Sequence, residues 1–310
     1  MNTQRVVIAS RRSRLAMTQS RYVQALLEGL EPGLEVAILE IVTSGDKILD
    51  SPLSQIGDRG LFVKEIEEAL LSGDADLAVH SAKDVPTALP EGLDLLAFPE
   101  REDPSDVFVG SLESSAGLTS GRRIGTSSLR RRSQLLARFP GLEIVDIRGN
   151  VETRIRKIQE DGLDGTILAA AGLKRLGRFD EAAFSFSDED MLSAVGQGSL
   201  AIEARRGDQR VAALLARLDH APTRAEVLAE RALMRALEGG CQVPIGARAR
   251  LTGDVLHLVA YVGSIDGSRS VRMGRAGSAE APAELGEELA AEMLVAGADE
   301  ILAQVRGATG

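Results

Sequence analysis

The sequence predicts an α/β protein with a smaller α+β domain at its C-terminal end. Two observations support this prediction. Short apolar runs alternate with amphipathic helical stretches through the first 200 of the 310 residues, which is the pattern of a sheet covered by helices. Beyond that region a helix is followed by two strands and a further helix, so the last part of the chain is expected to form a separate unit.

The first α/β set is expected to begin close to the N-terminus. Its predicted elements are, in order, a strand over 5–9, a helix over 13–30, a strand over 35–42, a helix over 61–71 and a short buried strand over 77–79. Pro32-Gly33 and Ser72-Gly73 end the two helices, because these pairs do not favour a further helical turn. A polar segment over 99–106 then marks a domain boundary.

A second α/β set follows this boundary. Its predicted elements are strands over 123–125, 143–147 and 166–169 and helices over 128–138 and 151–160. Residues 194–198 contain two glycines but lack the GxGxxG spacing, so they are interpreted as a hinge or crossover leading into an apolar run over 200–204.

The C-terminal unit is predicted to hold a helix over 224–237, strands over 248–251 and 256–262, and a helix over 283–295. The expected domains are therefore residues 1–99 with 200–217, residues 100–199, and residues 218–310.

Charge and composition argue against several classes of function. A net charge of −10 and nine aromatic residues argue against general nucleic-acid binding. The apolar run after the N-terminus is too short for a signal peptide, and no later stretch is long enough to span a membrane. A single cysteine gives no disulfide framework. We therefore expect a cytoplasmic protein without nucleic-acid or membrane partners.

Basic residues are concentrated in one region of this acidic chain. Residues 120–157 contain nine arginines and one lysine against three acidic residues, a local balance of +7. Arginine presents a planar fork of donors that fits carboxylate or phosphate groups. The cluster therefore predicts a site for a specific polyanionic ligand.

Two strand-to-helix turns in this region are candidate anion sites. In the first, Gly125-Thr126-Ser127-Ser128 precedes three arginines, so free N–H groups of a helix start lie beside positive charge. The alternative is an ordinary Ser/Thr cap with surface arginines. In the second, Arg148-Gly149-Asn150 leads into a helix that contains Arg154. Lys174-Arg175 is expected to add a third basic set at the same end of the sheet.

A lysine–aspartate pair follows the predicted strand over 77–79. Ser81, Lys83 and Asp84 occupy a strand end, and Pro86 restricts the chain just beyond them. Such a pair is usually a solvated surface pair. At a strand end it is better placed for chemistry, and Asp84 could stabilise a developing cation or move a proton. His80 is expected to be structural. No metal site is predicted, because the three histidines lie far apart in the sequence.

Cys241 lies between Gly239-Gly240 and Pro244, which predicts a loop. A free cysteine is more often a small buried apolar residue. Two preceding glycines argue against a packed helix or strand, so an accessible thiol is an equal alternative.

Together these segments resemble the porphobilinogen deaminase family, also called hydroxymethylbilane synthases, over essentially the whole chain. The segments that carry the resemblance include Val42-Thr43-Ser44-Gly45-Asp46, Gly60-Leu61-Phe62, Val79-His80-Ser81-Ala82-Lys83-Asp84-Val85-Pro86, Gly125-Thr126-Ser127-Ser128-Leu129-Arg130-Arg131, Arg148-Gly149-Asn150-Val151, Ala194-Val195-Gly196-Gln197-Gly198 and Gly239-Gly240-Cys241-Gln242-Val243-Pro244.

The resemblance implies a fold and an activity. It implies two lobes like those of periplasmic binding proteins and a smaller C-terminal α+β domain that carries the cysteine. It also implies that Cys241 holds a dipyrromethane cofactor through a thioether. The family condenses four porphobilinogen molecules on this primer, releasing ammonia each time, and then hydrolyses off the linear tetrapyrrole. The resemblance favours a monomer.

The same resemblance assigns roles to individual residues. Asp84 is the implied catalytic carboxylate. Residues implied to contact the cofactor are Cys241, Ser81, Lys83, Asp84, Thr126, Ser128, Arg130, Arg131, Arg148 and Gly149. Residues implied to contact substrate are Arg11, Arg154, Arg175 and Arg59. At Arg59 this chain departs from the family, which commonly has a lysine there, so the role of the covering loop is open.

A second class of function is a two-lobed binding protein for a carboxylated anionic solute. The arginine cluster and the two α/β sets suit it. It leaves the Cys241 loop and the Lys83-Asp84 pair without a purpose.

Overall fold

The computed structural model describes residues 5–43, 63–237 and 243–309. The chain divides into two units. Unit 1 comprises residues 1–102 and 199–224, and unit 2 comprises residues 103–198 and 225–310. The chain therefore leaves unit 1 after residue 102 and returns to it at residue 199. Both crossings lie at segments that the sequence marks as a boundary and as a crossover.

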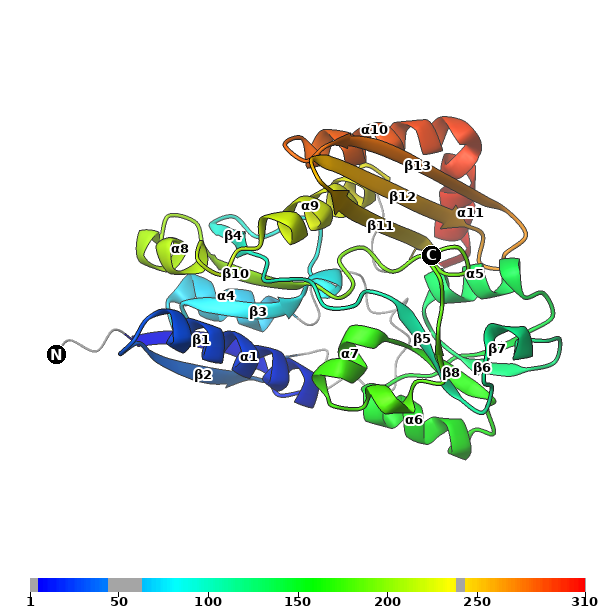
Figure 1. Cartoon of the computed structure of the whole chain (residues 1–310), viewed down its shortest axis with the longest axis horizontal. Helices are drawn as coiled ribbons and strands as arrows, with labels where there is room; N and C mark the ends of the chain where they lie inside the picture. Colours follow the sequence, from blue (N-terminus) through cyan, green and yellow to red (C-terminus); the bar gives the residue numbers. More distant parts are fainter. Residues whose placement is uncertain (1–4, 44–62, 238–242, 310) are drawn as a thin grey trace. The chain divides into compact units, whose positions relative to one another are not determined.

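Unit 1 is a five-stranded sheet with helices on both faces (Figure 1). Its elements are β1 (Arg5–Arg11), α1 (Arg14–Leu30), β2 (Glu35–Ile41), α4 (Lys64–Ser72), β3 (Leu77–Ser81), β4 (Leu93–Ala97), β10 (Leu200–Arg205) and α8 (Gln209–Leu215). The strand order is β2-β1-β3-β10-β4. Strands β1, β2 and β3 are parallel, and β10 is antiparallel to its two neighbours.

The two faces of this sheet bury different helices. Val23 and Leu27 of α1 and Val211 of α8 pack on one face, and Ile66 and Leu70 of α4 pack on the other. Successive side chains of a strand point to opposite faces, so the strands of a sheet covered on both sides carry apolar residues at most positions. Ser13 caps α1, because its side chain accepts a hydrogen bond from the Ala16 N–H.

Unit 2 contains a second five-stranded sheet. Its elements are β5 (Asp106–Gly110), β6 (Arg123–Gly125), α5 (Leu129–Arg138), β7 (Glu143–Val145), α6 (Val151–Glu160), β8 (Gly165–Ala169), α7 (Ala170–Arg175) and β9 (Phe184–Ser185). The strand order is β7-β6-β8-β5-β9. Leu135 of α5 packs on one face, and residues of α6 and α7 pack on the other.

The two sheets share one topology. In each, three parallel strands are followed by an antiparallel fourth strand, which is β10 in unit 1 and β5 in unit 2. This fourth strand is the first strand after a crossing in both cases. The sequence-based prediction of two similar α/β lobes joined by crossover segments therefore agrees with the observed strand order.

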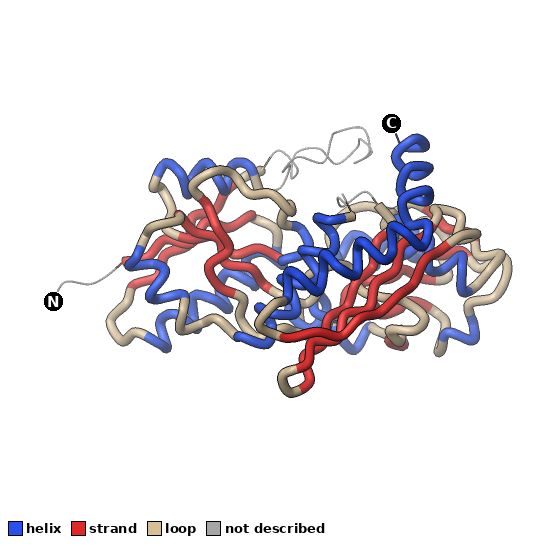
Figure 2. The backbone as a smooth tube through the Cα atoms, turned by 90° about the horizontal axis from the view of Figure 1, so that it is seen from above, coloured by secondary structure: helices blue, strands red, loops and turns tan. Residues whose placement is uncertain are grey.

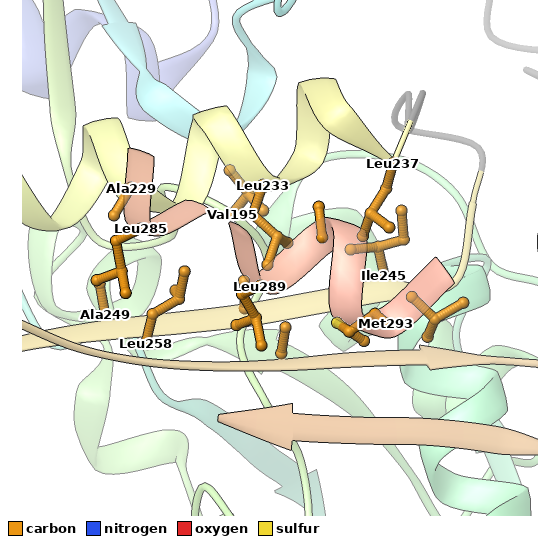
Figure 3. Close-up of a cluster of buried hydrophobic side chains, with 14 of the residues drawn as sticks. Val195, Ala229, Leu233, Leu237, Ile245, Ala249, Leu258, Leu285, Leu289 and Met293 are labelled. Atoms are coloured by element: carbon orange, nitrogen blue, oxygen red, sulfur yellow. The ribbon is translucent and has the colours of Figure 1, made fainter. Parts of the chain in front are cut away.

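The rest of unit 2 is a three-stranded antiparallel sheet with helices on one face. Its elements are α9 (Ala221–Ala236), which begins in unit 1, then β11 (Ile245–Thr252), β12 (Val255–Gly263), β13 (Ser270–Ser278), α10 (Pro282–Met293) and α11 (Asp299–Thr309). The long strands run side by side in Figure 2, and α11 ends at the C-terminal label. Leu233 of α9, Leu289 of α10 and Leu258 of β12 meet in its core (Figure 3).

Polar contacts join the two sheets of unit 2. The hydroxyl groups of Ser133 in α5 and Tyr261 in β12 lie 2.9 Å apart in a buried position. The carboxylate of Glu230 in α9 accepts from the Gly196 N–H at 2.7 Å and from the Ala249 N–H at 2.8 Å. Buried polar groups need such partners, so these contacts fix how the sheets pack. The division of unit 2 into two domains stays a prediction.

The α/β class and the α+β C-terminal part agree with the sequence-based prediction. The helix predicted over 224–237 begins earlier, since α9 starts at Ala221. Four of the strands were not predicted, namely β4, β5, β9 and β13. Helices α7, α8 and α11 were also missed.

Candidate functional site

The turn after β3 presents Asp84 at the surface of unit 1. β3 ends at Ser81, and one 3-10 turn, Ala82–Asp84, follows directly. Ala82 and Val85 are buried, whereas Asp84 is exposed. The Ala82 N–H donates to the carbonyl oxygen of Ser199 at 3.0 Å. The Asp84 carboxylate is therefore carried on an anchored backbone and is open to a ligand.

Three other predicted residues lie at the same edge of this sheet. Ser81 accepts a hydrogen bond from the side chain of buried Gln19 at 2.9 Å, and Lys83 is half-buried. Arg11 is the last residue of β1, which runs parallel to β3 and pairs with it. Because parallel strands end at one edge, the sheet brings Arg11 to the edge that bears Ser81, Lys83 and Asp84.

In unit 2, hydroxyl groups organise the start of α5. Ser128 is the N-cap and its side chain accepts from the Arg131 N–H at 3.4 Å. The Thr126 hydroxyl oxygen accepts from the Ser128 N–H at 3.2 Å, and Thr126 is buried. These side chains act as the caps that the sequence offered as the alternative to an anion site. The arginines that follow are not on the surface, however.

Arg130 and Arg131 converge on one buried carboxylate. Asp106 is fully buried at the start of β5. Its Oδ2 accepts from Arg130 Nη1 at 2.6 Å, and its Oδ1 accepts from Arg131 Nη2 at 2.7 Å and Nε at 3.1 Å. Both arginines are about one-twentieth exposed. Two guanidinium groups thus share one carboxylate, and the cluster has one positive charge in excess.

Main-chain and amide groups complete this cluster. Arg130 also donates to the Leu192 carbonyl at 2.6 Å, and Arg131 donates to the Ile167 carbonyl at 2.7 Å. Gln197 donates to Asp106 Oδ1 at 3.0 Å from the crossing segment. Burial alone would raise the pKa of Asp106, but the two arginines outweigh it and hold that pKa well below its ordinary value. Burial lowers the pKa of Arg130, and Asp106 opposes this shift.

The turn between β7 and α6 carries the second basic pair. Gly149 has a φ of +116°, and a Cβ atom there would lie 2.5 Å from Thr153 Cγ2, so glycine is required. Asn150 caps α6 by accepting from the Thr153 N–H at 2.8 Å. Arg154 Nε donates to the Gly149 carbonyl at 2.9 Å, which brings its guanidinium group to the turn that bears half-buried Arg148.

Arg175 lies at the end of α7 and contacts the crossing segment. Its Nη2 donates to the Gly198 carbonyl at 2.7 Å. The neighbouring Lys174 Nζ lies 3.1 Å from Asp103 Oδ2. Hydrogen bonds from Ser105 and the pairing with Lys174 outweigh burial and lower the pKa of Asp103. Each residue of the Lys174-Arg175 pair is therefore attached to one of the two segments that enter or leave unit 2.

The predicted residues thus fall into two sets. Unit 1 holds Arg11, Ser81, Lys83 and Asp84, and unit 2 holds Thr126, Ser128, Arg130, Arg131, Arg148, Gly149, Arg154 and Arg175. Arg59 and Cys241 lie outside the described residues.

Within residues 5–43, 63–237 and 243–309, no group of three His, Cys, Asp or Glu side chains could hold a metal ion. None of the helices described there is long and apolar enough to cross a membrane.

Sequence reasoning missed Asp106 and Gln197. Asp106 stands between the polar boundary segment and the apolar residues Val107 to Val109, so it resembled the last residue of a linker. A signal for its burial existed, because an acidic residue next to an apolar run is buried only when it is paired, but that signal does not identify the partner. Gln197 was considered only through its flanking glycines.

The chain matches two protein-family models. Residues 6–213 match the family model described as porphobilinogen deaminase, dipyromethane cofactor binding domain. Residues 224–295 match the C-terminal domain of porphobilinogen deaminase. The two matches meet near the point where the five-stranded sheets end and α9 begins.

Curated relatives match over nearly their whole length. The porphobilinogen deaminase of Trichlorobacter lovleyi is 51% identical over 98% of this chain and 98% of its own. That of Methylobacillus flagellatus is 52% identical over 96% of each chain. Among solved structures, the periplasmic aliphatic sulphonate binding protein SsuA from Escherichia coli gives a TM-score of 0.40 at 15% identity, over 76% of this chain and 71% of its own. On the family models and the curated relatives, the chain belongs to the porphobilinogen deaminase family of transferases and carries that family's dipyrromethane-cofactor-binding domain.

Proposed function

We propose that this chain condenses four porphobilinogen molecules head to tail, with loss of ammonia at each step, on a dipyrromethane primer attached through Cys241. It then releases the linear tetrapyrrole hydroxymethylbilane by hydrolysis. The observation that carries the proposal is the exposed Asp84 carboxylate on its anchored turn, in a member of this family. The proposal includes a monomeric, cytoplasmic enzyme with a small-molecule substrate.

The described residues fit a dipyrromethane group. Each of its pyrrole rings carries an acetate and a propionate, so it needs several cationic partners. The Asp106 cluster has one more guanidinium group than carboxylate, and a buried excess charge is costly unless a counter-ion approaches it. Arg148 and Arg154 add cationic groups at the turn of Gly149. When bound, the group supplies the nucleophilic pyrrole carbon to which the first substrate is joined.

The proposed roles of the protein side chains follow from charge. The arginines bind the ring carboxylates and orient each incoming porphobilinogen, since bidentate contacts fix direction as well as position. The protonated amino group of the substrate leaves its methylene carbon as ammonia, and that carbon becomes cationic. Asp84 stabilises this cation and the protonated pyrrole nitrogen. A carbon–carbon bond then forms, and the attacking pyrrole carbon loses its proton.

Two measurements on the purified protein test this function. Intact-mass analysis with peptide mapping should locate two linked pyrrole units on Cys241. Incubation with porphobilinogen should release ammonia and yield a product that cyclises to uroporphyrin. Binding of porphobilinogen without ammonia release would instead support the anionic-solute binding protein.

Replacing the catalytic carboxylate tests its assignment. The change Asp84→Asn keeps the size of the side chain but removes the charge, so turnover should fall by about 100-fold or more. The unfolding midpoint should stay as in the wild type, because Asp84 is exposed. Asp94→Asn is a matched control, since Asp94 is a half-exposed aspartate on β4 that pairs with Arg206. Wild-type turnover in Asp84→Asn would remove Asp84 from the mechanism.

A further inference from the structure

A buried histidine–glutamate pair lies directly before the Asp84 turn and has no part in the proposed chemistry. His80 is on β3, one residue before that strand ends. Its Nε2 lies 2.8 Å from Oε2 of Glu203 on β10. The two side chains are 5% and 1% exposed. Burying such a pair costs free energy, so we expect the pair to have a role other than stabilising the fold.

The strand register makes this pair a diagonal cross-strand contact. In the antiparallel ladder His80 is opposite Ala201, and Glu203 is opposite Ala78. His80 and Glu203 therefore project from the same face, two positions apart, at a separation that long side chains can bridge. The contact joins the end of β3 to β10, which is the first strand after the chain returns to unit 1 at residue 199.

Two other contacts restrain the same strand end. The Ala82 N–H donates to the Ser199 carbonyl at 3.0 Å, which extends the β3–β10 ladder into the turn. Gln19 of α1 donates to Ser81 at 2.9 Å. Side chains alternate along a strand, so Gln19 acts on the α1 face and the His80–Glu203 pair acts on the α4 face. The last two residues of β3, His80 and Ser81, are thus held from opposite faces of the sheet.

Few polar groups surround the Glu203 carboxyl group. The second carboxylate oxygen of Glu203, Oε1, is buried and has no hydrogen-bond partner among the described residues. Glu67 of α4 lies close enough for its charge to interact with both members of the pair. His80 is therefore the side chain that hydrogen-bonds the Glu203 carboxyl group, and loss of its ring would leave that buried polar group without this partner.

We propose that His80 and Glu203 are positioning residues for Asp84. Their contact fixes the orientation of the end of β3 and of the 3-10 turn that follows it. It therefore fixes the position of the Asp84 carboxylate relative to the reacting carbon. Misplacement of a catalytic group by about 1 Å can cost on the order of 100-fold in rate. The inference rests on the proposed role of Asp84 in this chain.

The test compares three variants in steady-state assays with porphobilinogen. His80→Ala removes the contact. His80→Gln returns a donor at about the reach of Nε2. Asp76→Asn is the matched control, because Asp76 precedes the other end of β3, where it accepts from the Val7 N–H at 2.8 Å and pairs with Arg210. Unfolding midpoints and the mass at Cys241 are measured for each variant.

We expect kcat of His80→Ala to fall by roughly 10- to 100-fold, with KM changed by less than about threefold. His80→Gln should recover most of that loss, and Asp76→Asn should lose stability without losing kcat. If His80→Ala does not fold, Glu203→Gln, which keeps the side-chain volume, takes its place with the same expectation. Equal kcat values in all variants and in the wild type would overturn the positioning role. A wild-type protein that releases no ammonia would instead contradict the proposed function.

Discussion

At the scale of the residue, Asp106 determines what Arg130 and Arg131 are able to do. An arginine on a protein surface can turn toward any passing anion. These two are held by a buried carboxylate, so their remaining N–H groups face a fixed direction. A fixed donor gives orientation as well as affinity, because little rotamer freedom is lost on binding. In the proposed anion site, Asp106 is therefore as important as the arginines themselves.

Removing this carboxylate should destabilise the protein strongly. Asp106→Ala leaves two buried guanidinium groups without their counter-ion, and we expect the free energy of unfolding to fall by about 3–5 kcal/mol. Denaturant titration followed by circular dichroism measures it. Asp188→Ala is the control, because Asp188 is on the surface and its carboxylate lies 4.0 Å from Arg250. The free energy of unfolding of this control should change by about 0–1 kcal/mol. Equal losses in both variants would contradict the argument.

Residue types and local spacing were readable from the sequence, but partners were not. The run of three arginines predicted an anion site, and Arg130 and Arg131 do lie at a strand-to-helix turn. Nothing in a linear sequence indicates that an aspartate 24 positions before Arg130 is their counter-ion. That pairing is created by the sheet, which places the start of β5 beside the end of β8. Tertiary contacts of this kind cannot be derived from local propensity.

At the scale of the element, the turn before α6 was predicted closely. The helix was expected over 151–160, and α6 has those bounds. Glycine before an Asn cap is a strong local signal, because Gly149 accepts a conformation that other residues avoid. Strand β13 was missed for the opposite reason. Its residues alternate in exposure, but Gly274 and Gly277 weaken the strand signal, and the tertiary ladder with β12 overrides that preference.

The Gly149 turn can be tested by adding one methyl group. In Gly149→Ala the new Cβ would lie 2.5 Å from Thr153 Cγ2 at a φ of +116°. We expect a loss of about 1–3 kcal/mol in the free energy of unfolding, because both the backbone and the contact are strained. Gly177→Ala provides the comparison, since Gly177 also has a positive φ but a Cβ there would meet no atom within 4 Å. A cost no larger than that of Gly177→Ala would show that Thr153 adjusts freely.

At the scale of the whole molecule, stability should depend on pH through Glu67. Burial, together with the charge of Glu203, raises the pKa of Glu67 to about 7, although His80 opposes this shift. The folded chain then retains a proton that the unfolded chain has released between the ordinary value, 4.5, and about 7. The free energy of unfolding therefore decreases as the pH rises through that range, and the loss is complete above it.

Glu67→Gln removes this titration. The variant should lose less stability between pH 5 and pH 8 than the wild type does, because its side chain is neutral throughout. Urea titrations at the two pH values give the comparison. Glu68→Gln is the control, since Glu68 is exposed and pairs with Lys64 on the same helix. An unchanged difference in Glu67→Gln would mean that the Glu67 carboxyl titrates as it does in water.

The place of β10 in the sheet of unit 1 has a consequence for synthesis on the ribosome. β10 lies between β3 and β4 in the finished sheet, yet it is made about 100 residues after β4. Until it emerges, both of those strands have unpaired edges, and exposed edges invite pairing with other chains. Contacts so distant in sequence also form slowly. The nascent N-terminal unit therefore passes through an incomplete stage, during which a chaperone that covers strand edges would raise the yield of native protein.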